Sequence, residues 1–284
     1  MFGLGYTGRA VAALARAEGW RVFSTSRTPE SVRAPAGVEV IAFDRAADLV
    51  GAMTHIVQTA PPNEHGDPAL ARHAAALEAA PALRWAGIMS TTGVYGDRGG
   101  GWVDEDTPPA PTGGRGRRRL EAERQWADAF ARCAVDIFRL AGIYGPGRSA
   151  LDDVRAGRAR RVDKPGQFFG RIHRDDIAGA VVAAMRQERG PGARVLNLAD
   201  DVPVANADVV AEAALLLGAP SPPLVPFETA LQGMSAMGRS FWAENRRVAS
   251  WKTQERLGYR WRYPSYREGL RAVLEQERGE GAAE

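Results

Sequence analysis

Two patterns of apolar residues alternate along the chain. Short, nearly continuous apolar runs predict strands at residues 20–27, 38–44, 54–60, 85–90, 135–140 and 194–198. Stretches with helical spacing separate most of these runs, and they include residues 9–17, 68–79 and 120–132. Alternating strands and helices predict a parallel sheet covered on both faces. Right-handed crossovers then give a doubly wound α/β fold.

A glycine-rich loop begins two residues into the chain and leads straight into the first helical stretch. Its spacing, Gly-x-Gly-x-x-Gly, is typical of a dinucleotide-binding turn between a strand and a helix. The free N–H groups at the helix N-terminus then bind phosphate. We therefore predict a pyrophosphate site at Gly3, Gly5, Tyr6, Thr7 and Gly8. A glycine-rich turn without chemical meaning is the alternative, and the strand and helix pattern that follows disfavours it.

The start of the chain is short for this arrangement. A first strand needs about five residues before the glycine loop, but only Met1 and Phe2 precede Gly3. That strand lies at the middle of the sheet, where each missing buried side chain would forfeit about 1.5–3 kcal/mol. We therefore expect the natural protein to begin several residues upstream with an apolar run.

The end of the second strand indicates which dinucleotide the chain prefers. An NAD site has Asp or Glu at this point to bind the ribose 2′-hydroxyl, whereas this chain has Ser26 and Arg27. A hydroxyl and a guanidinium suit a 2′-phosphate, so NADP is favoured over NAD. For Arg27 alone, a solvated loop arginine is the alternative. Asp44, at the end of the third strand, is also assigned to the cofactor site.

Composition indicates a soluble globular enzyme. Of the 284 residues, 45% are hydrophobic and 25% charged, and the net charge of +3 includes 34 acidic residues. This mixed surface gives no nucleic-acid motif. The densest basic run, at residues 115–119, lies before the predicted helix 120–132, where a solvated face is favoured over an RNA site.

Other compositional features limit the class of protein further. The only cysteine, Cys133, excludes a disulfide within the chain, and we expect a buried thiol there. No signal peptide or membrane-length apolar run is visible, so a cytoplasmic location is the default expectation. The four histidines show no metal-ligand spacing, and we assign no metal. The oligomeric state stays open, a homodimer included.

Several separated segments occur in an order known from one superfamily of enzymes. They are the glycine loop and residues 59–62, 90–96, 139–147, 171–178, 195–200 and 263–270. On these segments the chain resembles the extended and atypical short-chain dehydrogenases/reductases, in the NAD(P)-dependent epimerase/dehydratase branch. The resemblance implies a Rossmann-type NAD(P)-binding domain at residues 1–145, completed by a strand near 194–199. Residues 146–284 would then form mainly a small substrate-facing lobe.

The same resemblance assigns site residues. Thr59, Ala60 and Pro61 would line the cofactor, and Thr91 matches the hydroxyl that holds the substrate oxygen. The family's catalytic Tyr-x-x-x-Lys pair is replaced in this chain.

The replacements are Arg115 at the tyrosine position and Arg119 at the lysine position. The pKa of an arginine is about 12, so the side chain stays protonated near neutral pH and cannot serve as the base. Arg119 can still donate hydrogen bonds to the nicotinamide ribose. Arg115 can bind an anionic substrate group or the cofactor phosphates, and a surface arginine on a mobile loop is the alternative.

Three other residues are candidates for the missing acid. Tyr95 and Tyr144 each lie beside a glycine at the C-terminal edge of a strand, although an aromatic residue there is more often packing. His173 precedes two aspartates, of which Asp175 or Asp176 would cap the next helix. A histidine in that setting is more often structural than catalytic.

Two hypotheses about function follow. The first is an NADP-dependent oxidoreductase or epimerase/dehydratase-like enzyme that acts on a small polar substrate, sugar-derived compounds included. The second is a non-catalytic NADP(H)-binding redox sensor or partner-binding protein, which the missing tyrosine favours. Retention of Thr91, the segment at 59–62 and the loop at 144–146 favours the enzyme.

Overall fold

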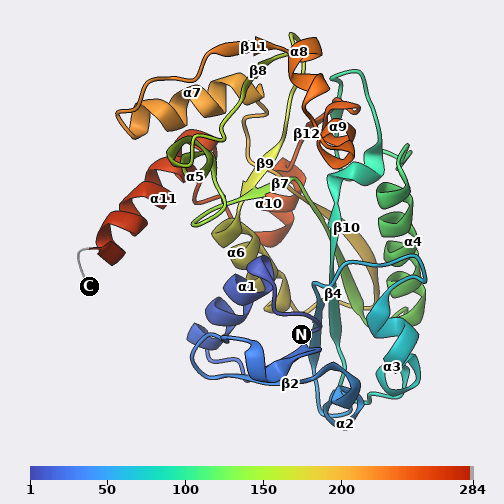
Figure 1. Cartoon of the computed structure of the whole chain (residues 1–284). Coiled ribbons are helices and arrows are strands. Elements are labelled where there is room, and N and C mark those ends of the chain that lie inside the picture. The colour runs from blue at the N-terminus through green and yellow to red at the C-terminus, as the bar shows by residue number, and fades with distance from the viewer. Residues whose placement is uncertain (282–284) are drawn as a thin grey trace.

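The computed structural model describes residues 1–281 and has a central parallel sheet (Figure 1). Its strands are β1 (Val22–Ser26), β2 (Val38–Ala42), β3 (His55–Gln58), β4 (Trp85–Thr91), β6 (Ala134–Leu140) and β10 (Gly192–Leu198). β2 pairs with β1, and β3, β4, β6 and β10 follow one another, all in parallel. The predicted strands are all present, with ends that differ by a few residues.

The first residues of the chain join the two parts of the sheet. Phe2 forms parallel bridges with Thr25 and with Gln58. Its N–H donates to the Val57 carbonyl at 2.9 Å, and the Thr25 N–H donates to the Met1 carbonyl at 3.0 Å. The strand order is therefore β2, β1, Phe2, β3, β4, β6 and β10. This is the doubly wound Rossmann-type order that the sequence predicts.

Helices cover both faces of this sheet. On one face α1 (Tyr6–Ala17) packs against α6 (Arg174–Met185), and on the other lie α3 (Pro68–Glu78) and α4 (Gly114–Ala129). Successive residues of β6 point to opposite faces. Phe138 therefore joins the core beneath α6, and Ile137 joins the core beneath α4. Cys133 is buried in this second core, as predicted.

The start of α4 corrects one prediction. The helix begins at Gly114 rather than at residue 120, so the basic run at 115–119 lies within its first turns. Glycine disfavours helix, but tertiary packing outweighs this preference here. A Cβ on Gly116 would lie 3.0 Å from the Gly93 carbonyl and 2.9 Å from the Pro111 side chain. The first turn of α4 can therefore pack closely against the loop after β4.

Residues after Tyr144 contribute to two regions. α6 and β10 lie with the large sheet, whereas a smaller region lies above it in Figure 1. That region contains α5 (Ala150–Arg155), β8 (Arg161–Asp163), α7 (Asn206–Leu216), β11 (Leu224–Pro226), α8 (Phe227–Gln232), α9 (Ala236–Trp242) and α11 (Tyr266–Gly281). β8 pairs with β11, and Leu151, Val209 and Leu270 belong to its core. The domain boundary at residue 145 stays a prediction.

Short strand pairs connect the two regions. β7 (Gly142–Tyr144) pairs with β9 (Arg171–His173), and β5 (Trp102–Val103) pairs with β12 (Arg247–Val248).

No helix within residues 1–281 is long and apolar enough to cross a membrane.

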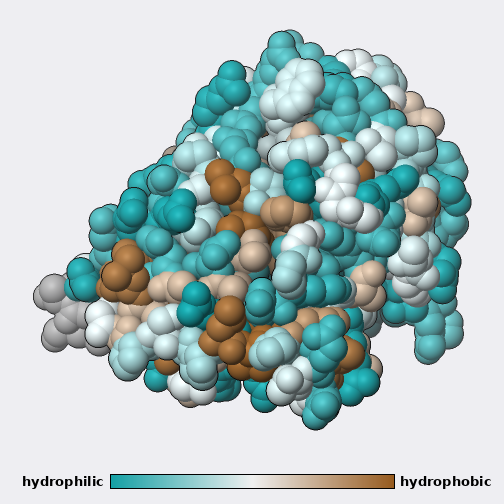
Figure 2. All heavy atoms as spheres, turned by 90° about the horizontal axis from the view of Figure 1, so that it is seen from above, coloured by the Kyte–Doolittle hydropathy of each residue, from teal (hydrophilic) through white to brown (hydrophobic). Residues whose placement is uncertain are grey.

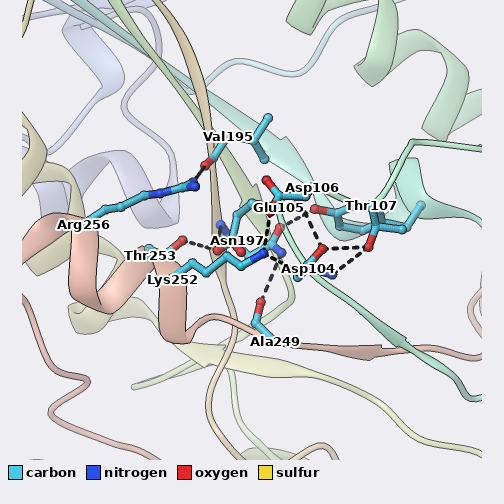
Figure 3. Close-up of polar contacts among 11 residues, drawn as sticks. Asp104, Glu105, Asp106, Thr107, Val195, Asn197, Ala249, Lys252, Thr253 and Arg256 are labelled. Atoms are coloured by element: carbon cyan, nitrogen blue, oxygen red, sulfur yellow. Dashed lines mark hydrogen bonds and ion pairs between the residues drawn. The ribbon is translucent and has the colours of Figure 1, made fainter.

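A polar cluster fixes the segment after β5 (Figure 3). The Glu105 carboxylate accepts from the Asn197 N–H at 3.3 Å and from the Thr253 hydroxyl at 2.6 Å. Thr253 belongs to α10 (Trp251–Leu257), where Lys252 donates to Asp104 at 2.6 Å. The segment that follows β5 is thereby bound to β10 and α10.

Candidate active site

The glycine loop has the shape that a pyrophosphate requires. Gly3 has a φ of +93°, a conformation that glycine adopts readily. A Cβ on Gly3 would lie 2.8 Å from the Thr59 hydroxyl, and one on Gly8 would lie 3.0 Å from the Gly3 carbonyl. Gly5, in contrast, borders open space, and α1 begins at the next residue with Tyr6 and Thr7 in its first turn. The loop and the helix N-terminus therefore fit a dinucleotide phosphate.

Side chains of the neighbouring strands support this loop from behind. The Gly3 N–H donates to the Thr25 hydroxyl at 3.3 Å, and the Ser24 hydroxyl donates to the Gly3 carbonyl at 3.3 Å. The Thr59 hydroxyl lies 3.0 Å from the carbonyls of both Phe2 and Gly3. Thr59 therefore holds the loop. Sequence analysis assigned Thr59 to the cofactor site and missed the two residues of β1.

A buried pair fixes the segment that contains Ala60 and Pro61. Gln58 accepts from the Ala60 N–H at 3.1 Å and donates to the Asp67 carboxylate at 2.6 Å. Asp67 also caps α3 by accepting from two of its N–H groups. Sequence analysis missed this pair, although an aspartate directly before a proline at a helix start is a recognisable cap signal.

The residues assigned to the adenosine end lie where two adjacent strands finish. Ser26 ends β1, and its hydroxyl accepts from the Thr28 N–H at 3.1 Å. Arg27 is exposed and makes no hydrogen bond or ion pair within residues 1–281. Asp44 follows β2 and pairs with Arg72 at 3.2 Å at the surface. Because the strands are parallel, these residues lie at the same edge of the sheet as the glycine loop.

Tyr6 lies between the glycine loop and the loop after β7. Its hydroxyl donates to the Pro146 carbonyl at 3.0 Å, and the guanidinium groups of Arg148 and Arg174 lie 5.6 and 5.2 Å from its ring centre. Burial is the main cause of the raised pKa of the Tyr6 phenol. Tyr6 therefore connects the cofactor loop to the segment that follows β7.

Thr91 ends β4, and Arg119 of α4 contacts the backbone of the same strand. The partly exposed Thr91 accepts from the Gly93 N–H at 3.1 Å through its hydroxyl. The Arg119 guanidinium donates to the Met89 carbonyl at 2.7 Å. Burial, and next the charge of Arg115, lower the pKa of Arg119 to about 10, so the group stays cationic at neutral pH. Both predicted site residues therefore lie near the C-terminal end of β4.

Arg115 lies one helical turn before Arg119, on the same side of α4. It is exposed, and its guanidinium lies 5.7 Å from the centre of the Phe241 ring in α9. Phe241 is itself 54% exposed. Arg115 and α9 thus face one another at the open edge of the site.

The assignments of Tyr95 and Tyr144 as substitute acids require correction. Tyr95 is fully buried and donates to the Asn197 amide at 2.8 Å. Tyr144 points toward α11, where its hydroxyl lies 3.4 Å from the Ser265 carbonyl and occupies the space beside Gly269. Burial raises the pKa of both phenols. Both tyrosines are therefore packing residues.

His173 also has a structural role. Its Nδ1 accepts from the Asp175 N–H at 3.2 Å, so His173 itself caps α6, and the predicted cap at Asp175 or Asp176 is wrong. Asp176 instead accepts from two N–H groups near the start of the last helix. The His173 ring packs between Tyr144 and Tyr263 with centroid distances of 5.2 and 4.2 Å. It is 1% exposed.

A buried ion pair lies beneath the site. Arg139 of β6 donates to the Glu123 carboxylate at 3.2 and 2.8 Å, and Ser90 of β4 donates to the same carboxylate. The side chains of the pair are 3% and 5% exposed. Their contacts bind α4 to β4 and β6. Sequence analysis missed Glu123 and Arg139, although a glutamate stands at this position in the resembled family's pattern.

Arg246, just before β12, is another cation that the sequence did not single out. Its Nη1 donates to the Gly96 carbonyl at 2.9 Å and to Glu244 at 2.7 Å. Its Nη2 faces Gly93, where a Cβ would lie 3.8 Å from that nitrogen and 3.4 Å from the Thr91 hydroxyl.

Figure 2 shows that hydrophilic residues make up most of the face seen from above, with hydrophobic residues in separate groups.

Solved structures resemble the whole chain. A conserved protein of unknown function from Silicibacter pomeroyi DSS is 44% identical, with a TM-score of 0.88 and 97% of each chain covered. A protein from Methylobacillus flagellatus, provisionally described as an NAD-dependent epimerase/dehydratase, is 26% identical, with a TM-score of 0.71 over 98% of this chain and 97% of that one. Human epimerase family protein SDR39U1 with NADPH is 20% identical, with a TM-score of 0.74 over 95% and 96%.

Curated relatives match shorter stretches. Protein YeeZ from Escherichia coli K12 is 29% identical over 204 residues, which cover 66% of this chain and 73% of the relative. The 3-diazoavenalumate denitrifying reductase from Streptomyces sp is 29% identical over 179 residues, which cover 59% and 58%. No family model matches the chain.

The fold and the glycine loop are those of the extended short-chain dehydrogenase/reductase superfamily, in the branch of the NAD(P)-dependent epimerases/dehydratases. Within that superfamily, the chain belongs to the same family as the Silicibacter pomeroyi protein.

Loss of the buried ion pair should destabilise the protein strongly. Glu123→Ala leaves the Arg139 charge buried and unpaired, which costs about 3–5 kcal/mol. Glu121→Ala, on the exposed side of the same helix, should change stability by less than about 0.5 kcal/mol. Urea denaturation of both variants measures the difference. A loss below about 1 kcal/mol in Glu123→Ala would show that the pair contributes little.

Burial of His173 should make stability depend on pH. Burial lowers the pKa of His173 from 6.5 to about 4, so the unfolded chain binds the proton more readily between these values. Its contribution to stability is therefore complete above pH 6.5 and lost as the pH falls toward 4, at about 1.4 kcal/mol per unit. His173→Asn, which can still cap α6, should flatten this slope in urea denaturation. Identical slopes would contradict the assignment.

Proposed function

We propose that this protein is an NADP-dependent oxidoreductase of the epimerase/dehydratase type that acts on a small polar substrate, sugar-derived compounds included. The observation that carries the proposal is that Thr91 ends β4 and that the Arg119 guanidinium donates to the Met89 carbonyl of the same strand. The dinucleotide loop lies at the same edge of the sheet. A reductase among the relatives and an NADPH-bound structure of the same fold support the assignment.

NADP is preferred because of the second strand. Arg27 is exposed and has no partner within residues 1–281, so its guanidinium is available for a 2′-phosphate. No acidic side chain occupies the end of β1, where an NAD site would need one. Gly3, Gly5 and Gly8 would hold the pyrophosphate, and Arg119 would donate to the nicotinamide ribose.

The chain's own groups would act on the substrate oxygen through hydrogen bonds and charge. Bound NADPH supplies a hydride. Thr91 donates a hydrogen bond to the carbonyl oxygen, and Arg115 binds an anionic group of the substrate or the cofactor phosphates by charge. Because an arginine does not release its proton near neutral pH, the proton that completes the reduction comes from another donor.

A non-catalytic NADP(H)-binding sensor is the second candidate function. The burial of Tyr95 and Tyr144 favours it, because neither phenol replaces the missing acid. A thermal-shift screen distinguishes the two functions. NADPH, NADP, NADH and NAD are each tested alone and with a panel of sugar nucleotides and carbonyl compounds. For an enzyme, the melting temperature should rise further when a substrate is added to the protein with bound cofactor. For a sensor, the cofactor alone should raise it, and no compound of the panel should add to the rise.

Arg27→Ala should separate the two reduced cofactors. A charge-assisted hydrogen bond contributes about 1.5–3 kcal/mol, so the variant should bind NADPH roughly ten- to a hundredfold more weakly and NADH almost unchanged. Fluorescence titration measures both dissociation constants. Arg21→Ala, at the opposite end of β1 and paired with Glu39, is the matched control and should change neither. Equal weakening of both cofactors by Arg27→Ala would contradict NADP preference.

Arg115→Ala should affect binding more than chemistry. An arginine that holds the substrate or cofactor by charge should raise KM about tenfold or more, while kcat falls less. The pH profile should lack the ionisation of an activated tyrosine. Steady-state kinetics at several pH values provide the measurement. A loss confined to kcat, with both binding constants intact, would show that Arg115 takes part in the chemical step.

If the protein is inactive, a double variant offers a further test. Arg115→Tyr with Arg119→Lys restores the family's residue pair beside Thr91, and some carbonyl reduction should appear. NADPH oxidation against a carbonyl panel measures it. Activity in the double variant and none in the parent would identify the parent as a non-catalytic binder.

A further inference from the structure

We propose that the substrate carries a carboxylate and that Arg246 binds it beside Thr91. The inference names a substrate class for the proposed oxidoreductase and rests on that function. The carboxylate would lie against Arg246 Nη2, in the space above Gly93. A carbonyl or alcohol on the neighbouring carbon would then lie next to the Thr91 hydroxyl.

The geometry around Gly93 supports this placement. A single point, the position of a Cβ on Gly93, lies 3.4 Å from the Thr91 hydroxyl and 3.8 Å from Arg246 Nη2. The two groups are therefore close enough to contact adjacent atoms of one small molecule. Since residue 93 is a glycine, no side chain fills this space.

Arg246 is held in place by its other nitrogen. The recorded hydrogen bonds of its guanidinium both use Nη1, which donates to the Gly96 carbonyl and to Glu244. Glu244 also accepts from Thr112 at 2.5 Å. The side chain of Arg246 is 16% exposed, so it retains access to solvent. A guanidinium fixed on one side and open on the other is suited to a planar anion.

The local charges favour an anion of low charge. Arg115 and Arg119 lie on α4, Arg246 contacts the loop after β4, and the carboxylate of Glu244 partly offsets these positive charges. Arg115 and Arg119 lie one turn apart on α4, and after burial the charge of Arg115 is the next cause of the lowered pKa of Arg119. A carboxylate relieves the repulsion between these two cations. The carboxylate of Glu244, next to Arg246, repels a doubly charged phosphate more strongly than a singly charged carboxylate, so a phosphate fits this site less well.

An exposed aromatic side chain lies beside Arg115. Phe241 of α9 is 54% exposed, and its ring centre lies 5.7 Å from the Arg115 guanidinium. An aromatic or aliphatic body attached to the carboxylate would cover this surface. We therefore infer a 2-oxo or 2-hydroxy acid with an apolar substituent as the class of substrate.

Benzoylformate and its neutral amide, benzoylformamide, test this inference. Both are titrated by ligand-observed NMR against the full chain, with and without saturating NADPH, and NADPH binding is measured separately by fluorescence. The acid should bind at least tenfold more tightly than the amide. Arg246→Gln should remove this preference, while Arg247→Gln should keep it, because Arg247 lies 4.0 Å from the Phe168 ring centre instead.

A second variant tests the same site without changing Arg246, in case Arg246→Gln fails to fold. Gly93→Ala keeps Arg246 but adds a methyl group within ordinary contact distance of Thr91, and it should weaken benzoylformate severalfold. Equal affinity for acid and amide, or a preference that survives Arg246→Gln, would overturn the carboxylate site. An Arg246-dependent preference without any NADPH binding would support the site and contradict the oxidoreductase. NADPH binding without a preference for the acid would support the proposed cofactor and contradict the carboxylate site.

Discussion

The arrangement of the site depends on the buried ion pair between Glu123 and Arg139. Moving two charges out of water costs several kcal/mol for each, and only close contact with further hydrogen bonds offsets that cost. Here two bonds join the pair, Ser90 donates to the carboxylate, and the Arg139 guanidinium lies 4.8 Å from the centre of the Tyr95 ring. Because the members come from α4, β4 and β6, the pair sets the position of α4 relative to Thr91.

The cofactor loop is held by a different set of contacts. Hydroxyls of β1 and of the segment after β3 bind its backbone, and Gln58 with Asp67 fixes the neighbouring turn. These groups face the loop from the sheet side and leave the side at Gly5 open. The predicted dinucleotide edge is therefore shaped mainly by backbone, whereas the proposed substrate edge is shaped by charged side chains.

Replacement of the family's tyrosine and lysine by two arginines changes the electrostatics of that substrate edge. A titrating phenol gives way to groups that remain cationic, and Arg246 adds a third guanidinium from the other side. Arginine side chains stabilise a negatively charged oxygen, but they do not exchange a proton near neutral pH. The superfamily fold does not determine this chemistry, since one fold serves many functions.

The sequence by itself determined the sheet, its order and the glycine loop, because apolar periodicity and glycine spacing are local properties that any chain of this fold must satisfy. It also identified Thr91 and Arg119 as candidate site residues. Tertiary structure decided the rest. The start of α4 depends on a close approach to Gly93, and Tyr95 points inward because Asn197 lies there. Arg246 and Thr91 both lie near Gly93 although they are more than 150 positions apart, and no local pattern encodes such an arrangement.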